Sequence, residues 1–116
     1  MREIENARIS STFLGIEDHG VMSFTLFLDY GGSGQGFGQY CLDEPVKIDG
    51  KFIRRKGTAL GCDCILQILI TLGVDSWEKL PGTYVKADHD SAKIYRIAPI
   101  LGDKWFDVEE FFKDKS

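Results

Sequence analysis

The sequence predicts a single α+β domain in which one main helix packs on an antiparallel sheet of about five strands, with short helical turns. Strand-like segments lie on both sides of one strongly apolar helical segment, residues 58–72, and they do not alternate with helices as a parallel sheet requires. The 116 residues contain no repeat and no linker, and they suffice for one core. We therefore expect one domain over residues 1–116.

Two strands joined by a turn are expected first. Residues 4–16 are rich in β-branched and apolar types, and in residues 21–30 large apolar side chains recur at every second position from Phe24 to Tyr30. The stretch between them, Glu17–Gly20, has the composition of a turn. The two segments predict an antiparallel hairpin.

The one clear helix follows residues 44–56, which we interpret as a polar connection with a turn at Asp49–Gly50. Thr58 is the expected N-cap and Gly73 the expected C-cap. Gly61 in the first turn is expected to allow close packing on the sheet. The apolar face of this helix is broad, so we expect the sheet or a second subunit to cover it.

The C-terminal third predicts two more strands. A short helical turn, capped by Ser76, ends before Pro81. Strands at about 83–87 and 93–100 follow, and a last helical turn at about 108–112 closes the chain.

Composition limits the function classes. The net charge of −4 and the pI of about 5.1 argue against a generally basic surface for duplex nucleic acid. No apolar run approaches about 18 residues, and the N-terminal stretch lacks the apolar core of a signal peptide. Three cysteines, two of them in a C-x-C spacing, fit neither a disulfide framework nor a common zinc motif, so we expect a cytoplasmic protein without a metal or cofactor.

The glycine-rich stretch 31–38 is the first candidate site. It matches neither the G-x-G-x-x-G pattern nor a Walker lysine, and a strand, at about 37–42, rather than a helix follows it. One interpretation is a flexible hairpin loop with bulges. In the other, the amide of Gln35 and the ring of Phe37 contact a nucleobase or a protein partner.

Basic residues give the second candidate. Arg54 and Arg55 precede the start of the helix, where guanidinium groups and the partial positive charge of the helix end together suit a diphosphate. The alternative is a solvated charged turn. The third candidate is Asp103 and Lys104 beside Trp105 and Phe106, which is either part of a nucleotide pocket or a charged pair next to two core aromatics.

Trp77 has the same two interpretations, a ring that stacks on a ligand or one that packs under the short turn. The sequence offers no set of residues that suggests catalysis. Each cysteine lies in an expected strand or helix, and neither histidine is paired by pattern with a nucleophile. We therefore expect a protein that is not an enzyme.

Several stretches along nearly the whole chain resemble a family of small phage proteins, the first Thoeris anti-defence family. The matching stretches, in chain order, are Glu17–Gly20, Leu28–Gly38, Arg55–Ala59, Trp77–Gly82 and Asp103–Phe106. Such proteins bind a cyclic ADP-ribose isomer, the signal of a bacterial defence system, between subunits and do not cleave it. Some members also bind cyclic trinucleotides at separate sites in a hexamer.

The resemblance implies a homo-oligomer, dimer or hexamer, in the host cell cytoplasm. It implies that Arg55, Asp103 and Lys104 hold phosphate and ribose, and that Trp77 or Phe37 stacks on the base. Some members of the family have arginine at the position of Lys104. Lysine there provides a single ammonium charge in place of a guanidinium that can donate two parallel hydrogen bonds. Two alternatives stay open: an inhibitor that binds a host defence protein, and an enzyme that degrades the signal.

Overall fold

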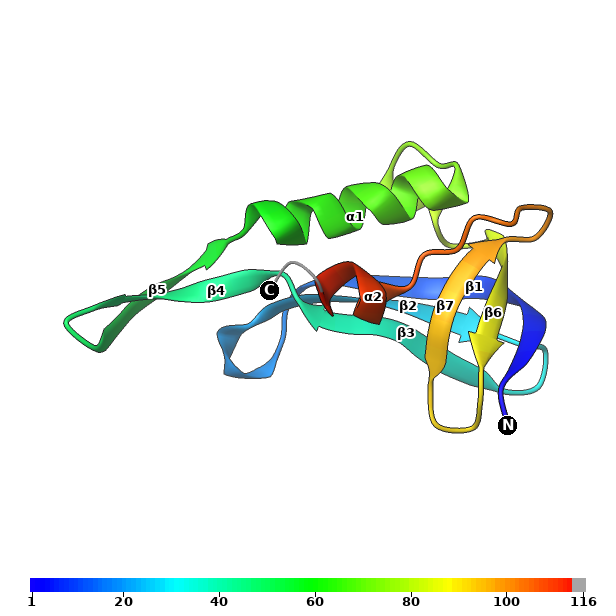
Figure 1. Ribbon diagram of the computed structural model, residues 1–116, viewed down its shortest axis with the longest axis horizontal. Helices are drawn as coiled ribbons and strands as arrows, with labels where there is room; N and C mark the ends of the chain where they lie inside the picture. The colour runs from blue at the N-terminus through cyan, green and yellow to red at the C-terminus, as the bar shows by residue number, and fades with distance from the viewer. Residues whose placement is uncertain (114–116) are drawn as a thin grey trace.

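The computed structural model describes residues 1–113, and these form one elongated α+β fold (Figure 1). A sheet of five strands has the order β3-β2-β1-β6-β7, and every neighbouring pair is antiparallel. The strands are β1 (Glu3–Ile16), β2 (Met22–Asp29), β3 (Gly34–Cys41), β6 (Tyr84–His89) and β7 (Ile94–Pro99). The predicted fold class is confirmed.

One helix covers one face of this sheet, α1 (Ala59–Leu72), as Figure 1 shows. Its caps are those expected: the Thr58 hydroxyl accepts a hydrogen bond from the Gly61 amide at 2.8 Å, and Gly73 is left-handed with φ 73°. Gly61 also permits the close approach, because a Cβ there would lie 2.2 Å from the carbonyl oxygen of Leu42.

The core lies between α1 and the inward face of the sheet. In β2 the apolar positions Phe24, Leu26 and Leu28 are buried as the pattern predicts, but Ser23 and Thr25 on the opposite face are buried too, at 7% and 3% exposure. The helix adds Cys64, Ile68 and Leu72. A short helix, α2 (Val108–Lys113), closes one side, and the 3-10 turns η1 (Asp18–Gly20) and η2 (Trp77–Lys79) connect strands and helix.

Residues 44–56 are not a mere connection. They form most of a second, two-stranded sheet, β4 (Asp43–Ile48) and β5 (Lys51–Gly57), around the predicted turn. At this turn Asp49 and Gly50 both have positive φ, 52° and 78°, which is typical of a tight hairpin. In Figure 1 the pair projects away from the five-stranded sheet, and we call it the arm, residues 43–57.

Two smaller expectations need correction. β3 begins at Gly34 rather than near residue 37, so more than half of the glycine-rich stretch 31–38 is strand. Ser76 makes no side-chain cap bond to the η2 turn.

No helix within residues 1–113 is both long and apolar enough to span a membrane.

Candidate functional site

The arm carries the predicted cations, but Arg55 is already engaged. Its guanidinium donates two hydrogen bonds to the Asp43 carboxylate, at 3.1 Å and 2.7 Å, and the Asp43 side chain is only 6% exposed. The paired guanidinium holds the pKa of Asp43 well below its usual range. Arg55 therefore links the two strands at the base of the arm, and a phosphate would have to compete with the Asp43 carboxylate for its guanidinium.

Of the two predicted arginines, Arg54 is the one that no carboxylate engages among the described residues. Its side chain is exposed, and the one bond it makes among the described residues is to the main-chain oxygen of Arg55, at 3.3 Å. Lys56 reaches Glu44 at 3.9 Å, with both side chains about half exposed. A phosphate group would therefore meet Arg54 without displacing a carboxylate.

An apolar groove lies at the foot of the arm, under the N-terminal half of α1. It has a volume of about 390 Å³, and its lining includes Leu14, Met22, Leu42, Ile65, Leu66 and Leu69. The surface suits apolar side chains rather than a phosphate.

The C-terminal candidate is a loop that follows β7. Trp105 is half-buried, with the Arg96 guanidinium 4.2 Å and the Lys86 ammonium 5.3 Å from its ring centre. Lys86 also donates to the carbonyl oxygen of Gly102. Asp103 and Lys104 are exposed. Trp105 thus belongs to a cation–π cluster on the sheet edge, and the charged pair beside it faces solvent.

Lys104 also lines a groove of about 370 Å³ between this loop, α1 and α2. Three carboxylates lie in the same lining, those of Asp63, Asp107 and Glu110. Carboxylates accept hydrogen bonds from ribose hydroxyls but repel phosphate. Lys104 is the one positively charged residue in the lining of this groove.

The two predicted stacking rings lie in or against the core. Phe37 is 0% exposed, and its ring meets Phe106 edge-on at 6.3 Å. Trp77 is partly buried and meets Phe24 edge-on at 6.3 Å. In this conformation the ring of Phe37 is not accessible to a base.

Gln35 joins a polar cluster at the end of the sheet far from the arm. Its side-chain oxygen accepts from the Tyr30 hydroxyl at 2.7 Å, and its nitrogen donates to the carbonyl oxygen of Asp90 at 2.8 Å. The Tyr30 ring stacks on His89 at 4.5 Å. A cavity of about 450 Å³ opens beside these side chains.

The electrostatics of this end are acidic. His89 contacts Glu5 at 2.9 Å, and Glu3 lies 3.9 Å from the same ring nitrogen. Burial, together with the charges of Glu5 and Glu3, raises the pKa of Tyr30 to about 12. The hydroxyl therefore stays protonated and remains a donor to Gln35 at neutral pH.

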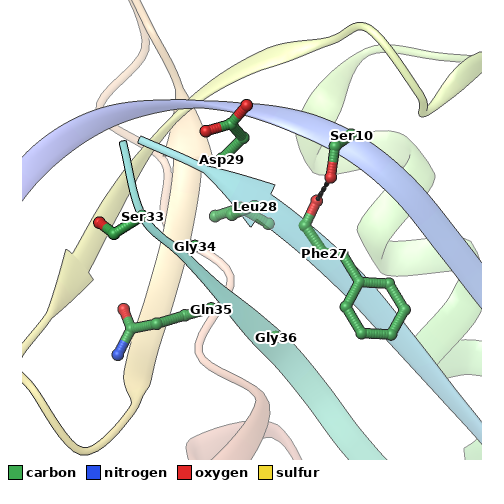
Figure 2. Close-up of a pocket in the computed structure, with 8 residues that line it drawn as sticks. All are labelled: Ser10, Phe27, Leu28, Asp29, Ser33, Gly34, Gln35 and Gly36. Atoms are coloured by element: carbon green, nitrogen blue, oxygen red, sulfur yellow. Dashed lines mark hydrogen bonds between the residues drawn. The ribbon is translucent and has the colours of Figure 1, made fainter. Parts of the chain in front are cut away.

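A second hollow, of about 470 Å³, lies on the β2–β3 edge (Figure 2). The Ser10 hydroxyl donates to the carbonyl oxygen of Phe27 there, at 3.1 Å, and Gln35 and Ser33 project on the other side of the lining. Asp29 is the charged residue of its lining. A hollow with this charge is unsuited to a phosphate.

The structure does not bring the predicted ligand residues together within one chain. Arg54 and Arg55 lie on the arm at one end of the molecule, and Asp103 and Lys104 lie in the loop after β7 at the opposite end (Figure 1). The chain measures 50 × 28 × 27 Å along its principal axes. Each end therefore offers half of a phosphate site at most.

Sequence reasoning missed the cluster of Glu3, Glu5 and His89. Glu3 lies just before the strand expected over residues 4–16, so the alternation that places Glu3 and Glu5 on one face was not apparent. Their histidine partner lies 84 residues away from Glu5 in the chain, and no local pattern links them.

No protein-family model, curated protein or solved structure matches the chain.

Proposed function

We propose that this protein is a homo-oligomer that binds a signalling nucleotide of the cyclic ADP-ribose type and holds it without cleavage. In this proposal it is a phage anti-defence protein of the Thoeris type that acts in the host cell cytoplasm. The resemblance of its motifs motivates the proposal. One structural observation supports the oligomeric site: the free cations among the predicted ligand residues lie on separate elements, Arg54 on the arm and Lys104 in the loop between β7 and α2.

A diphosphate needs cations that converge on it. Arg54 and Lys104 cannot converge within one elongated chain, but they can between two copies if the arm of one reaches the loop after β7 of the other. Such a pairing would place Asp103 beside the site, where its carboxylate can accept hydrogen bonds from ribose hydroxyls. The site would then exist only in the oligomer.

The arm has the properties of an element that a second copy covers. Ile48, Phe52 and Ile53 are 59%, 58% and 53% exposed, and the strands that carry them pair only with each other. A two-stranded hairpin alone is marginally stable in water. Contact with another copy would bury this apolar surface and hold Arg54 in place.

The same apolar surface favours a second candidate, an inhibitor that docks the arm on a host defence protein. Binding without cleavage is favoured over an enzyme that degrades the signal. Among residues 1–113, no hydrogen bond joins a cysteine, serine or threonine to a histidine, so the nucleophile–histidine pair that many hydrolases use is not among the contacts.

The first experiment is a retention assay. The purified protein is incubated with cyclic ADP-ribose isomers, freed of unbound nucleotide and denatured by heat, and the released compounds are identified by mass spectrometry. Intact nucleotide in near-stoichiometric amount is expected. An altered product would indicate the enzyme instead. Failure to retain these isomers, and cyclic trinucleotides tested in parallel, would favour the protein-binding inhibitor.

Two variants test the shared site. Arg54→Ala and Lys104→Ala should each weaken retention about tenfold or more, because each removes a charge-assisted bond to phosphate. Lys51→Ala, an exposed cation on the same arm, is the matched control and should bind normally.

A mixture of the two variants distinguishes a shared site from two separate ones. If each site takes Arg54 from one copy and Lys104 from the other, co-refolded chains regain about a quarter of the sites in a random dimer. No recovery on mixing would contradict a site built from both residues across the interface.

A further inference from the structure

We propose that Glu3, Glu5 and His89 form a binding site for one divalent transition-metal ion of the zinc type. This inference is independent of the proposed nucleotide site. The cluster lies at the end of the sheet far from the arm, and its three ligand atoms lie within 4.8 Å of one another.

The register of two strands creates the cluster. Glu3 on β1 pairs directly with His89 on β6, and Glu5, two residues further on, projects from the same face as Glu3. The His89 Nε2 atom lies 2.9 Å from a carboxylate oxygen of Glu5 and 3.9 Å from one of Glu3. The backbone of a regular sheet therefore sets the spacing of all three ligands.

These separations bracket those of a zinc coordination shell. With zinc–ligand bonds of about 2.0–2.2 Å, the ligand atoms of a tetrahedral site lie roughly 3.3 Å apart. The two measured separations fall on either side of that distance. The side chains of Glu5 and Glu3 are 43% and 69% exposed, so both can make the small rotations that would close the shell.

The histidine is built into the site. His89 is only 8% exposed, and its ring is held against Tyr30 by stacking at 4.5 Å with 17° between the planes. Its Nε2 faces both carboxylates, while its buried Nδ1 has no hydrogen-bond partner among the described residues. Stacking and burial thus hold the ring so that its Nε2 atom and two carboxylates face one point, where a cation could bind all three groups.

The charge of the cluster also favours a cation. Two carboxylates converge on one imidazole, and neither forms an ion pair with a lysine or arginine within residues 1–113. The nearby Arg2 is engaged with Asp88, at 2.7 Å. A divalent ion would neutralise both carboxylates, and the mixed nitrogen and oxygen ligands favour zinc over magnesium or calcium.

The site would keep an open coordination position. Glu3 and His89 line the cavity of about 450 Å³, so water can complete the shell. Metal-bound histidines usually donate their other N–H to an acceptor, and Nδ1 of His89 has none within residues 1–113. We therefore expect an exchangeable ion, bound about 10–100-fold more weakly than at a site whose histidine has such an acceptor, rather than a permanent structural zinc.

The test is a calorimetric titration of the chelator-treated full chain with zinc chloride alone. The exposed thiols of Cys41 and Cys62 are replaced by serine in every protein, because thiolates also bind zinc. One zinc per chain is expected. Glu3→Gln and Glu5→Gln should each weaken binding about tenfold or more, and magnesium chloride should give no binding heat.

Glu78→Gln, outside the cluster, is the control and should bind zinc as the parent does. Both cluster glutamates are at least partly exposed, so their glutamine variants should fold, and melting curves without metal check this. Absence of zinc binding in the parent would overturn the proposal. So would zinc binding that neither glutamine substitution weakens.

Discussion

At the scale of single residues, packing explains two glycines of the glycine-rich stretch, Gly34 and Gly38, without a ligand. A Cβ on Gly38 would lie 2.4 Å from the ring of Phe24, and its φ of 108° disfavours other residues. A Cβ on Gly34 would lie 2.8 Å from the carbonyl oxygen of Leu28. These positions need glycine so that β3 can lie against β2, and this answers why a glycine-rich stretch forms a strand.

Asp90 carries the first prediction, which concerns acid stability. Its carboxylate accepts hydrogen bonds from the Tyr95 hydroxyl and from the amides of Ala92 and Lys93, and these bonds lower its pKa to about 2. The stability they contribute is complete above the unfolded-state pKa of about 3.9 and is lost as the pH falls toward 2. Asp90→Asn should therefore lower Tm at pH 7 and flatten its fall between pH 4 and pH 2.

Thermal melts followed by circular dichroism over this pH range provide the measurement. Asp75→Asn is the control, because the Asp75 side chain is 80% exposed. The lowered pKa values of Asp43 and Asp88 act in all three proteins, so the comparison isolates Asp90. Parallel Tm curves for the parent and Asp90→Asn would contradict the assignment.

The roles of the candidate site residues could be predicted only in part, because residue type does not show pairing or burial. Residue type alone identified Arg54 and Arg55 as cations, but it could not show that Asp43 pairs with Arg55 and leaves Arg54 free. The burial of Phe37 follows from its pairing with the buried Leu26 of β2, which the glycines around Phe37 do not reveal. Pairing and burial depend on neighbours that lie elsewhere in the chain.

At the scale of elements, α1 was well predicted because its signals are local. The cap residues Thr58 and Gly73 and the helical spacing of apolar residues lie within one segment. The arm was missed because strands paired only with each other bury no continuous face, so they show no alternating pattern. Its Asp49–Gly50 turn was nevertheless recognisable from the residue types.

The contact between α1 and the main chain of Leu42 gives the second prediction. Gly61→Ala should destabilise the protein by about 1 kcal/mol or more, although alanine favours helices, because its Cβ would force the helix away from Leu42. Urea unfolding measures the change. Gly57→Ala, where no atom lies within 4 Å of the added Cβ, should change stability by less than about 0.5 kcal/mol. Equal effects would show that the close approach is unimportant.

At the scale of the whole molecule, the elongated shape leaves apolar side chains exposed along its length. The 50 Å long axis runs from the arm to the end of the sheet that carries the acidic cluster. Along the way α1 exposes Leu66 and Ile70, at 50% and 52%. The expectation that a second subunit covers part of α1 stays a prediction. The sequence could not indicate that the proposed phosphate-binding cations lie on separate elements, Arg54 on the arm and Lys104 in the loop between β7 and α2.

The last prediction tests whether the arm holds copies of the chain together. Light scattering coupled to gel filtration should give a multiple of the 13.0 kDa chain mass for the parent. Phe52→Ser combined with Ile53→Ser should shift the mass toward the single chain, because it removes the apolar tip that a second copy would bury. Lys51→Ser, also exposed on the arm, should leave the assembly intact. A parent that is already monomeric, or an assembly that survives the double substitution, would contradict a role of the arm in oligomerisation.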